Sequence, residues 1–254
     1  MIRVLLSGYS GKLGHAIAEA VAESGAAEVV AGVAIDAGQT ACAFPTFTDI
    51  FDCTIQADVI VDCTVAHVVP RVLDYAVVKK TPVVICTTGL DDMAEAKLCD
   101  AAKAVPVFRS ANMSLGINLL AELMEKMTRV LGSSGFDIEI VEKHHNRKLD
   151  APSGTAFILA DTINAAADGA YEYVHDRSQV RQARGKKELG IHAVRGGTIV
   201  GEHSVIFAGK DEVVEITHSA ASKEVFAVGA VKALAYVVTK PAGLYGMRDL
   251  MADA

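Results

Sequence analysis

The sequence contains no tryptophan, only six prolines and only five cysteines among its 254 residues. The cysteine number is odd, no C-x-x-C occurs, and all five lie in the first hundred residues, at Cys42, Cys53, Cys63, Cys86 and Cys99. This usage argues against structural disulfides and favours buried thiols in a reducing compartment. Nothing beside these cysteines indicates a catalytic thiol.

Long hydrophobic runs are also missing. The apolar run at the N-terminus is too short for a signal peptide and leads directly into glycine-rich sequence. The longest later stretch, residues 225–238, is interrupted by Lys232 and is too short to span a bilayer. We therefore expect a cytoplasmic protein that makes no membrane contact.

Positive charge is the third scarcity. The 24 lysines and arginines face 31 acidic residues, which gives a net charge of −7 and a pI near 5.6. Such a balance makes a nucleic-acid partner a poor expectation. An anionic substrate would need a local cluster of basic residues, because the overall field repels it. A hydrophobic content of 51% is enough for one large domain or two small ones.

The first 110 residues alternate between short β-branched runs and amphipathic segments. Strands are predicted at residues 2–6, 28–35, 59–63, 82–86 and 105–108, and helices at residues 13–24, 69–79 and 91–104. This alternation predicts an α/β fold, a Rossmann-type doubly wound parallel sheet with helices on both faces.

The pattern changes after residue 112. Helices are predicted at residues 116–131, 156–167 and 225–239, strands at 137–143, 191–195, 198–207 and 212–218, and a polar loop at 169–188. Successive strands separated by glycine turns predict a mixed or antiparallel sheet. The second part is therefore expected to be a smaller α+β domain.

A glycine-rich turn stands between the first strand and the first helix. Its spacing is G-x-x-G-x-x-G, which predicts a dinucleotide site, with the pyrophosphate at the helix N-terminus. The residues are Gly8, Tyr9, Ser10, Gly11, Lys12, Leu13 and Gly14. Asp36 follows 22 residues after Gly14, where an acid meets the ribose 2′-OH. The alternatives are an ordinary glycine turn and a strand-end acid in a turn.

The most informative run extends from Glu142 to Ala156 and reads EKHHNRKLDAPSGTA. Histidine is the residue type suited to proton transfer near neutral pH, so His144 and His145 could serve as acid or donor, and Lys148 could supply a charge or a proton. Ser153, Gly154 and Thr155 begin a helix whose amides and hydroxyls can hold a carboxylate. The run thus predicts an anion site with a proton source. A solvated basic loop is the alternative, and an isolated His-His pair is a poor metal site.

This run resembles the motif of the dihydrodipicolinate reductases, now named 4-hydroxy-tetrahydrodipicolinate reductases. The resemblance extends along the whole chain in order. Its further segments are CTTGL from Cys86, SANMS from Ser110 with Gly116 and Asn118, GEH from Gly201, and GLYGM from Gly243.

The resemblance implies a role for each matching residue. His144 resembles the family's proton donor or acceptor and Lys148 its proton donor, while His145 with Ser153, Gly154 and Thr155 resembles the substrate carboxylate site. The cofactor residues are the glycine turn, Asp36 and two further loops, which comprise Cys86, Thr87, Thr88, Ser110, Ala111, Asn112 and Met113. Cys86 stands where many members carry glycine. Lys223 stands where arginine is expected, which leaves its role open.

The family also implies an assembly and an activity. Residues 1–112 with 225–254 would bind the dinucleotide, and residues 113–224 would bind a small dicarboxylate and form a homotetramer. The activity would be reduction of (hydroxy-)dihydrodipicolinate by NAD(P)H to tetrahydrodipicolinate in lysine and diaminopimelate biosynthesis. Asp36 itself favours NADH as the cofactor, with NADPH possible through Lys12. The alternatives are another two-domain amino-acid-pathway dehydrogenase, such as an aspartate or homoserine dehydrogenase, and a non-enzymatic NADH-binding redox sensor.

Overall fold

The computed structural model describes residues 1–39 and 42–253, and these form two compact units. Unit 1 comprises Met1–Leu115 and Lys223–Ala254, and unit 2 comprises Gly116–Ser222. In the described part of the chain, no helix is both long and apolar enough to cross a membrane.

Unit 1 is built on a seven-stranded sheet in which every pairing is parallel. In spatial order the strands are β12 (Gly243–Tyr245), β6 (Pro106–Arg109), β5 (Val83–Ile85), β4 (Val59–Asp62), β1 (Ile2–Ser7), β2 (Ala27–Val33) and β3 (Thr46–Phe47). The Rossmann-type sheet that the alternating pattern predicted is confirmed.

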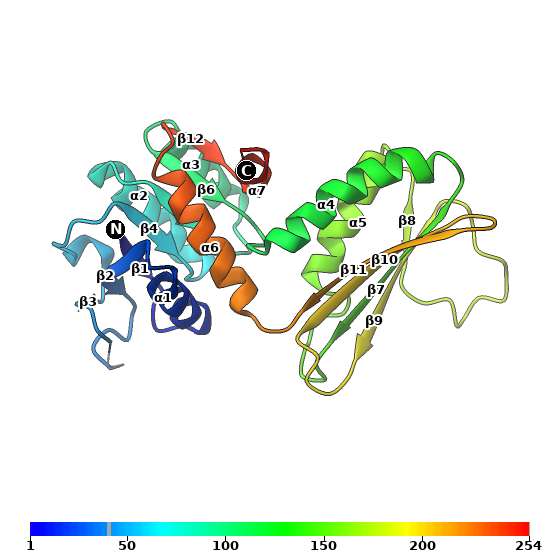
Figure 1. The fold of residues 1–254 in the computed structure, drawn as a ribbon, viewed down its shortest axis with the longest axis horizontal. Helices are drawn as coiled ribbons and strands as arrows, with labels where there is room; N and C mark the ends of the chain where they lie inside the picture. The colour runs from blue at the N-terminus through cyan, green and yellow to red at the C-terminus, as the bar shows by residue number, and fades with distance from the viewer. Residues whose placement is uncertain (40–41, 254) are drawn as a thin grey trace. The chain divides into compact units, whose positions relative to one another are not determined.

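Helices cover both faces of this sheet (Figure 1). Alternate residues of β1 point to opposite faces, so Val4 and Leu6 enter one core and Leu5 the other. The helices are α1 (Lys12–Ser24) and α6 (Glu224–Val237) on one face, and α2 (Val69–Lys79) and α3 (Asp92–Ala102) on the other. Helix α6 packs against α1, so the C-terminal helix returns to unit 1. The short elements are η1 (Ile50–Asp52), η2 (Ala66–Val68) and α7 (Met247–Ala252).

Unit 2 is a five-stranded mixed sheet with two helices on one face (Figure 1). In spatial order its strands are β11 (Val213–Ala220), β10 (Gly201–Ala208), β7 (Asp137–His144), β9 (Glu188–Arg195) and β8 (Glu172–Val174). Strand β7 runs parallel to β9 and antiparallel to β10, as a mixed sheet requires. The helices are α4 (Leu115–Met127), continued by a π-helical turn (Thr128–Gly132), and α5 (Gly154–Ala166).

Some details differ from the sequence-based expectation. Strand β8 lies inside residues 169–188, which were expected to be a loop, and it pairs in parallel with β9. Three residues are too few to show the alternation that marks a strand. Strand β2 ends at Val33, so Asp36 lies in the following turn and not at the strand end.

Candidate active site

The glycine turn after β1 has the geometry that only glycines permit. Gly8 has a φ of 89°, and a Cβ there would lie 2.9 Å from the carbonyl oxygen of Cys63. A Cβ on Gly14 would lie 2.2 Å from the carbonyl oxygen of Gly8, so α1 can start this close to the turn only without a side chain. Gly11 caps α1, and no acidic residue occupies the first helical turn. The amides there suit a phosphate, so this turn fits a dinucleotide.

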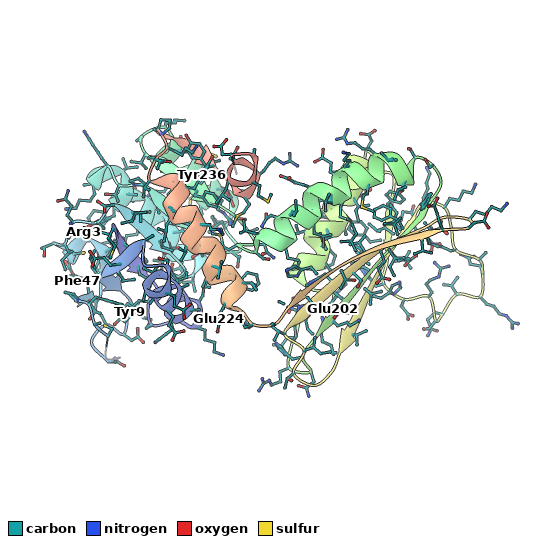
Figure 2. All side chains as sticks on the ribbon, in the orientation of Figure 1. Arg3, Tyr9, Phe47, Glu202, Glu224 and Tyr236 are labelled. Atoms are coloured by element: carbon teal, nitrogen blue, oxygen red, sulfur yellow. The ribbon has the colours of Figure 1, made fainter. Side chains whose placement is uncertain are left out.

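Asp36 lies beside the glycine turn, as the dinucleotide hypothesis requires. The hydroxyl of Ser10 donates to Oδ1 of Asp36 at 2.6 Å. Lys12 is exposed, whereas Leu13 is half-buried. Tyr9, labelled in Figure 2, is 3% exposed and packs edge-on against Phe44. Tyr9 can therefore contribute only its backbone to a bound cofactor.

A buried acid that the sequence-based prediction missed organises the next loop. Asp62 ends β4 and accepts hydrogen bonds from Thr64 Oγ1 at 2.8 Å and from Thr87 Oγ1 at 2.6 Å. Burial raises the pKa of Asp62, and these hydrogen bonds counteract part of that rise. Thr87 is thus anchored by its hydrogen bond to Asp62, and Thr88, the next residue, is exposed. Cys86 is buried, which raises the pKa of its thiol and makes a nucleophilic role unfavourable.

The loop after β6 is held by its own side chains. Ser110 Oγ donates to the carbonyl oxygen of Asn112 at 2.6 Å, and Oδ1 of Asn112 accepts from the amide of Ser114 at 2.9 Å. Met113 is buried in the core, and Ala111 is exposed. Both predicted nicotinamide-side loops, at 86–88 and 110–113, follow the carboxyl ends of β5 and β6. Parallel sheets bind ligands at that edge.

In unit 2, one buried carboxylate holds together the predicted catalytic residues. Glu142 is fully buried and receives Nη1 and Nη2 of Arg195 on its two oxygens, both at 2.7 Å. Nδ1 of His144 lies 2.7 Å from Oε2 of Glu142. The amide of Ser153 donates to Oε1 at 2.9 Å. A single side chain therefore positions both the histidine and the start of α5.

The charges in this network favour an ionised Glu142. Burial by itself raises the pKa of Glu142, but hydrogen bonds from Arg195 and His144 outweigh it and hold the pKa below its usual value. With Glu142 as an acceptor, Nδ1 of His144 carries the proton and Nε2 is left for other chemistry. A Cβ on Gly201 would lie 3.0 Å from that Nε2, so glycine keeps the space beside it open.

Ser153 is buried at the start of α5. It is 2% exposed and is the N-cap of α5, with Oγ accepting from the amide of Ala156 at 3.2 Å. Nε2 of His203 lies 2.9 Å from the same oxygen. Gly154 is exposed, and a Cβ there would meet no atom within 4 Å. A ligand can therefore reach the N-terminus of α5 at Gly154.

Lys148 and His145 lie on the segment between β7 and α5. Nζ of Lys148 lies 2.8 Å from Oδ1 of Asp150, and this ion pair lowers the pKa of Asp150. His145 is half-buried. His144 and Lys148 both act electrostatically on His203, whose pKa falls to about 4 mainly through burial. The ring of His144 lies edge to face against that of His203, with 5.2 Å between the centroids. The Ala151–Pro152 bond that precedes Ser153 is cis.

Three members of this cluster were not assigned a role from the sequence: Glu142, Arg195 and His203. Glu142 stands inside the motif, but nothing local shows that its side chain faces inward. Arg195 pairs with His144 across β9 and β7, and His203 pairs with Glu142 across β10 and β7. Only the strand register brings these residues together.

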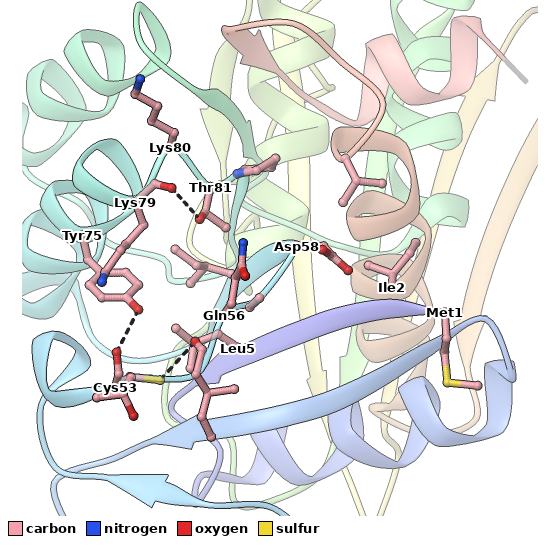
Figure 3. Close-up of a pocket in the computed structure, with 16 residues that line it drawn as sticks. Met1, Ile2, Leu5, Cys53, Gln56, Asp58, Tyr75, Lys79, Lys80 and Thr81 are labelled. Carbon is pink, nitrogen blue, oxygen red and sulfur yellow. Dashed lines mark hydrogen bonds between the residues drawn. The ribbon is translucent and has the colours of Figure 1, made fainter.

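A separate cavity lies at the opposite edge of the unit 1 sheet (Figure 3). Its volume is about 810 Å³, and Met1, Asp58 and Pro82, which precede β1, β4 and β5, are among the residues that line it. Tyr75 closes one side and donates from its hydroxyl to the carbonyl oxygen of Cys53. None of the predicted site residues lines this cavity. Among the described residues, no group of three acidic, histidine or cysteine side chains could hold a metal ion.

A glycine turn at the carboxyl edge of a parallel sheet, in a chain whose second unit holds a buried Glu–His pair, is typical of a two-domain nicotinamide-dependent oxidoreductase. Residues 2–113 match the family model described as "Dihydrodipicolinate reductase, N-terminus", and residues 116–251 match its C-terminal counterpart. The chain belongs to the dihydrodipicolinate reductase family.

Curated relatives extend over nearly the whole chain. The 4-hydroxy-tetrahydrodipicolinate reductase of Caldanaerobacter subterraneus subsp. tengcongensis is 48% identical over 251 residues, which is 99% of this chain and 98% of that protein. The reductase of the same name from Clostridium tetani is 44% identical over 255 residues, with 100% of this chain and 98% of that protein covered.

Solved structures share the fold. A dipicolinate-bound dihydrodipicolinate reductase from Paenisporosarcina sp. TG-14 superposes with a TM-score of 0.83 at 24% identity, covering 98% of this chain and 99% of that one. A probable dehydrogenase from Thermotoga maritima gives a TM-score of 0.64 at 9% identity, covering 99% of this chain and 93% of the other.

Proposed function

We propose that this chain reduces 4-hydroxy-tetrahydrodipicolinate, with loss of water, to tetrahydrodipicolinate in lysine and diaminopimelate biosynthesis. The observation that carries the proposal is the Glu142 carboxylate, which contacts His144 and the amide of Ser153 at once. A proton source and a carboxylate-binding helix start are thereby fixed relative to each other, as reduction of a dicarboxylate requires.

Unit 1 would hold the cofactor. The amides of the glycine turn would hold the pyrophosphate, Asp36 the adenosine ribose, and the loops at 86–88 and 110–113 the nicotinamide end. When bound, the nicotinamide supplies the hydride that reduces C4 of the substrate ring. Thr87, anchored to Asp62, would keep its loop from moving, and Thr88 would face the cofactor.

The cofactor choice would favour NADH, with appreciable use of NADPH. An ionised Asp36 accepts from a ribose 2′-OH and repels a 2′-phosphate, and Ala37 follows it where an arginine would be needed for the phosphate. Lys12 is exposed at the start of α1 and is the residue that would admit NADPH.

Unit 2 would hold the substrate and supply the proton. Ser153, Gly154, Thr155 and His145 would bind one carboxylate, where the N–H groups of the first turn of α5 favour an anion. Lys148 would donate the proton that completes the reduction. His144, oriented by Glu142, would donate or accept a proton at Nε2. The positive charges gathered here offset the acidic balance of the whole chain.

The outer face of the unit 2 sheet would form a homotetramer. Helices α4 and α5 cover one face, and the other carries half-buried residues such as Val141 and Ile206 beside Glu202, which Figure 2 labels on β10. A half-apolar sheet face without its own helices is suited to a second copy.

A turnover assay tests the activity. The substrate is generated by the condensing synthase that precedes this step, and loss of NADH absorbance is followed. We expect enzyme-dependent oxidation of NADH that needs the dicarboxylate. Oxidation with aspartate semialdehyde alone, or none with the cyclic substrate, would contradict the proposal.

A further inference from the structure

His203 belongs to the short GEH segment of β10. It has no role in the proton transfer or the cofactor binding proposed above. It is 4% exposed and pairs in register with Glu142 across the sheet. Its ring meets that of His144 edge to face, with 5.2 Å between centroids and 73° between planes. Its Nε2 lies 2.9 Å from Oγ of Ser153. The contact therefore links His203 to the predicted carboxylate site.

The hydrogen bonds at Ser153 Oγ can be counted. A hydroxyl has one proton to donate and two lone pairs. One lone pair accepts from the amide of Ala156. Two arrangements remain for His203. Either its Nε2–H donates to the second lone pair of Ser153 Oγ, or the Ser153 hydroxyl donates its own proton to Nε2. Only the first arrangement leaves the Ser153 proton for a ligand.

The surroundings of the other ring nitrogen of His203, Nδ1, favour the first arrangement. Burial and the nearby charge of His144 lower the pKa of His203 to about 4, so the ring is neutral at pH 7 and carries one N–H. Nδ1 of His203 is buried and has no hydrogen-bond partner in the part of the chain that the structure describes. A buried N–H without an acceptor is rarer than a buried acceptor without a donor. The proton therefore belongs on Nε2.

We propose that His203 is a positioning residue for the dicarboxylate substrate. Its Nε2–H occupies the second lone pair of Ser153 Oγ and thereby aims the Ser153 hydroxyl proton at the substrate carboxylate. This inference rests on the proposed function, because it needs a carboxylate at the start of α5. It assigns His203 no direct contact with the substrate and no part in proton transfer.

The test measures binding of pyridine-2,6-dicarboxylate, a planar analogue, to the NADH-loaded full-length protein by calorimetry. Three variants are compared: His203→Phe keeps the ring and removes the donor, His203→Gln restores an N–H near the Nε2 position, and Ser153→Ala removes the hydroxyl. We expect His203→Phe to weaken binding by about 10- to 100-fold, the scale of one hydrogen bond to a charged group. His203→Gln should recover most of this loss, and NADH affinity should stay unchanged.

A double variant separates positioning from packing. If His203 acts through Ser153, adding His203→Phe to Ser153→Ala should cost nothing further. A wild-type affinity in His203→Phe, an equal loss in the Phe and Gln variants, or fully additive losses would each overturn the inference. If His203→Phe does not fold, His203→Asn, whose amide is too short to reach Ser153, provides the same contrast with Gln. Failure of the wild-type protein to bind the analogue at all would contradict the proposed function itself.

Discussion

At the scale of single residues, the site depends on where protons are held. Lys148 has 21% of its side chain exposed and is paired with Asp150, so it is a cation at the edge of the Glu142 network and not inside it. His144 is inside, with one ring nitrogen committed to Glu142. The two residues therefore differ in freedom: Lys148 can move toward a ligand, and His144 is fixed.

We predict that Lys148→Ala lowers kcat by about 10²-fold or more, the scale of a lost general acid, and leaves NADH affinity nearly unchanged. The matched control is Arg147→Ala, which removes the exposed cation one residue earlier and should leave kcat near wild type. Steady-state kinetics at saturating substrate provide the measurement. Losses confined to KM and imitated by high salt would mean that Lys148 only adds positive potential.

Asp36 is expected to determine the preference between NADH and NADPH. Asp36→Ser should lower the ratio of kcat/KM for NADH to that for NADPH by about tenfold or more, because a like-charge contact with the 2′-phosphate disappears. Lys12→Ala should change the ratio in the opposite direction. A wild-type enzyme with a strong preference for NADPH would show that Lys12 outweighs Asp36.

For single residues, the sequence predicts proximity where the residues lie close together along the chain. The motif places His144, Lys148 and Ser153 within ten residues, and in the structure both His144 and Ser153 contact Glu142. It could not find Arg195, which lies 53 residues from Glu142 and reaches it only through strand pairing. Side-chain direction was also out of reach: Tyr9 and Thr87 were expected at the cofactor, but their side chains are buried.

At the scale of elements, two glycines in the turn between β1 and α1 have different roles: we expect Gly11 to matter for cofactor binding and Gly14 for folding. Gly11→Ala places a methyl 3.4 Å from the carbonyl oxygen of Gly8, an ordinary contact, so the fold should keep its thermal midpoint. NADH affinity should still fall, because the methyl would stand where the pyrophosphate approaches. Calorimetric titration with NADH and a melting curve test both halves.

Gly14→Ala should behave in the opposite way. A methyl 2.2 Å from the same oxygen forces α1 away from the turn, so the melting midpoint should drop along with NADH affinity. Unchanged stability in Gly14→Ala, or a large loss of stability in Gly11→Ala, would contradict this assignment of roles.

Helices and strands could be predicted from the sequence where the segment is long enough to show a pattern of buried apolar residues. The strands β1, β4 and β5 alternate between two apolar cores and were predicted within two residues of their ends. Strands β3, β8 and β12 have two or three residues each and exist because a neighbouring strand offers backbone groups. Such pairings follow from tertiary structure, and no pattern in the segment itself indicates them.

At the scale of the whole molecule, stability should depend on pH through His203. Its pKa is about 4 in the folded state and near 6.5 in an unfolded chain, so between these values the unfolded state binds more protons. Stability from the neutral ring is complete above pH 6.5 and is lost as the pH falls toward 4. We expect this term to cost about 2 kcal/mol between pH 7 and pH 5.

Urea unfolding of wild type and His203→Gln at the two pH values checks this. The variant should lose less stability on acidification, since glutamine does not titrate. Any constant cost of the substitution cancels in the comparison. Equal losses in both proteins would show that His203 is not buried in its neutral form.

Assembly is the second molecular prediction. We expect a homotetramer in light scattering, and Ile206→Glu should shift it to smaller species, because the new charge would stand between Glu139 and Glu215 on the outer sheet face. Val78→Glu, a matched change on the exposed side of α2, should leave the assembly intact. A monodisperse wild-type monomer at micromolar concentration would reject the proposed interface.

The central claim is that the segment from His144 to Thr155 holds the dicarboxylate. A crystal structure of the protein with NADH and pyridine-2,6-dicarboxylate tests it most directly. We expect one carboxylate on the amides of Gly154 and Thr155 with the Ser153 hydroxyl, and Lys148 within hydrogen-bond distance of the analogue. An analogue bound elsewhere, for instance in the cavity beside Lys79 and Tyr75, with the His144 to Thr155 segment untouched, would contradict it.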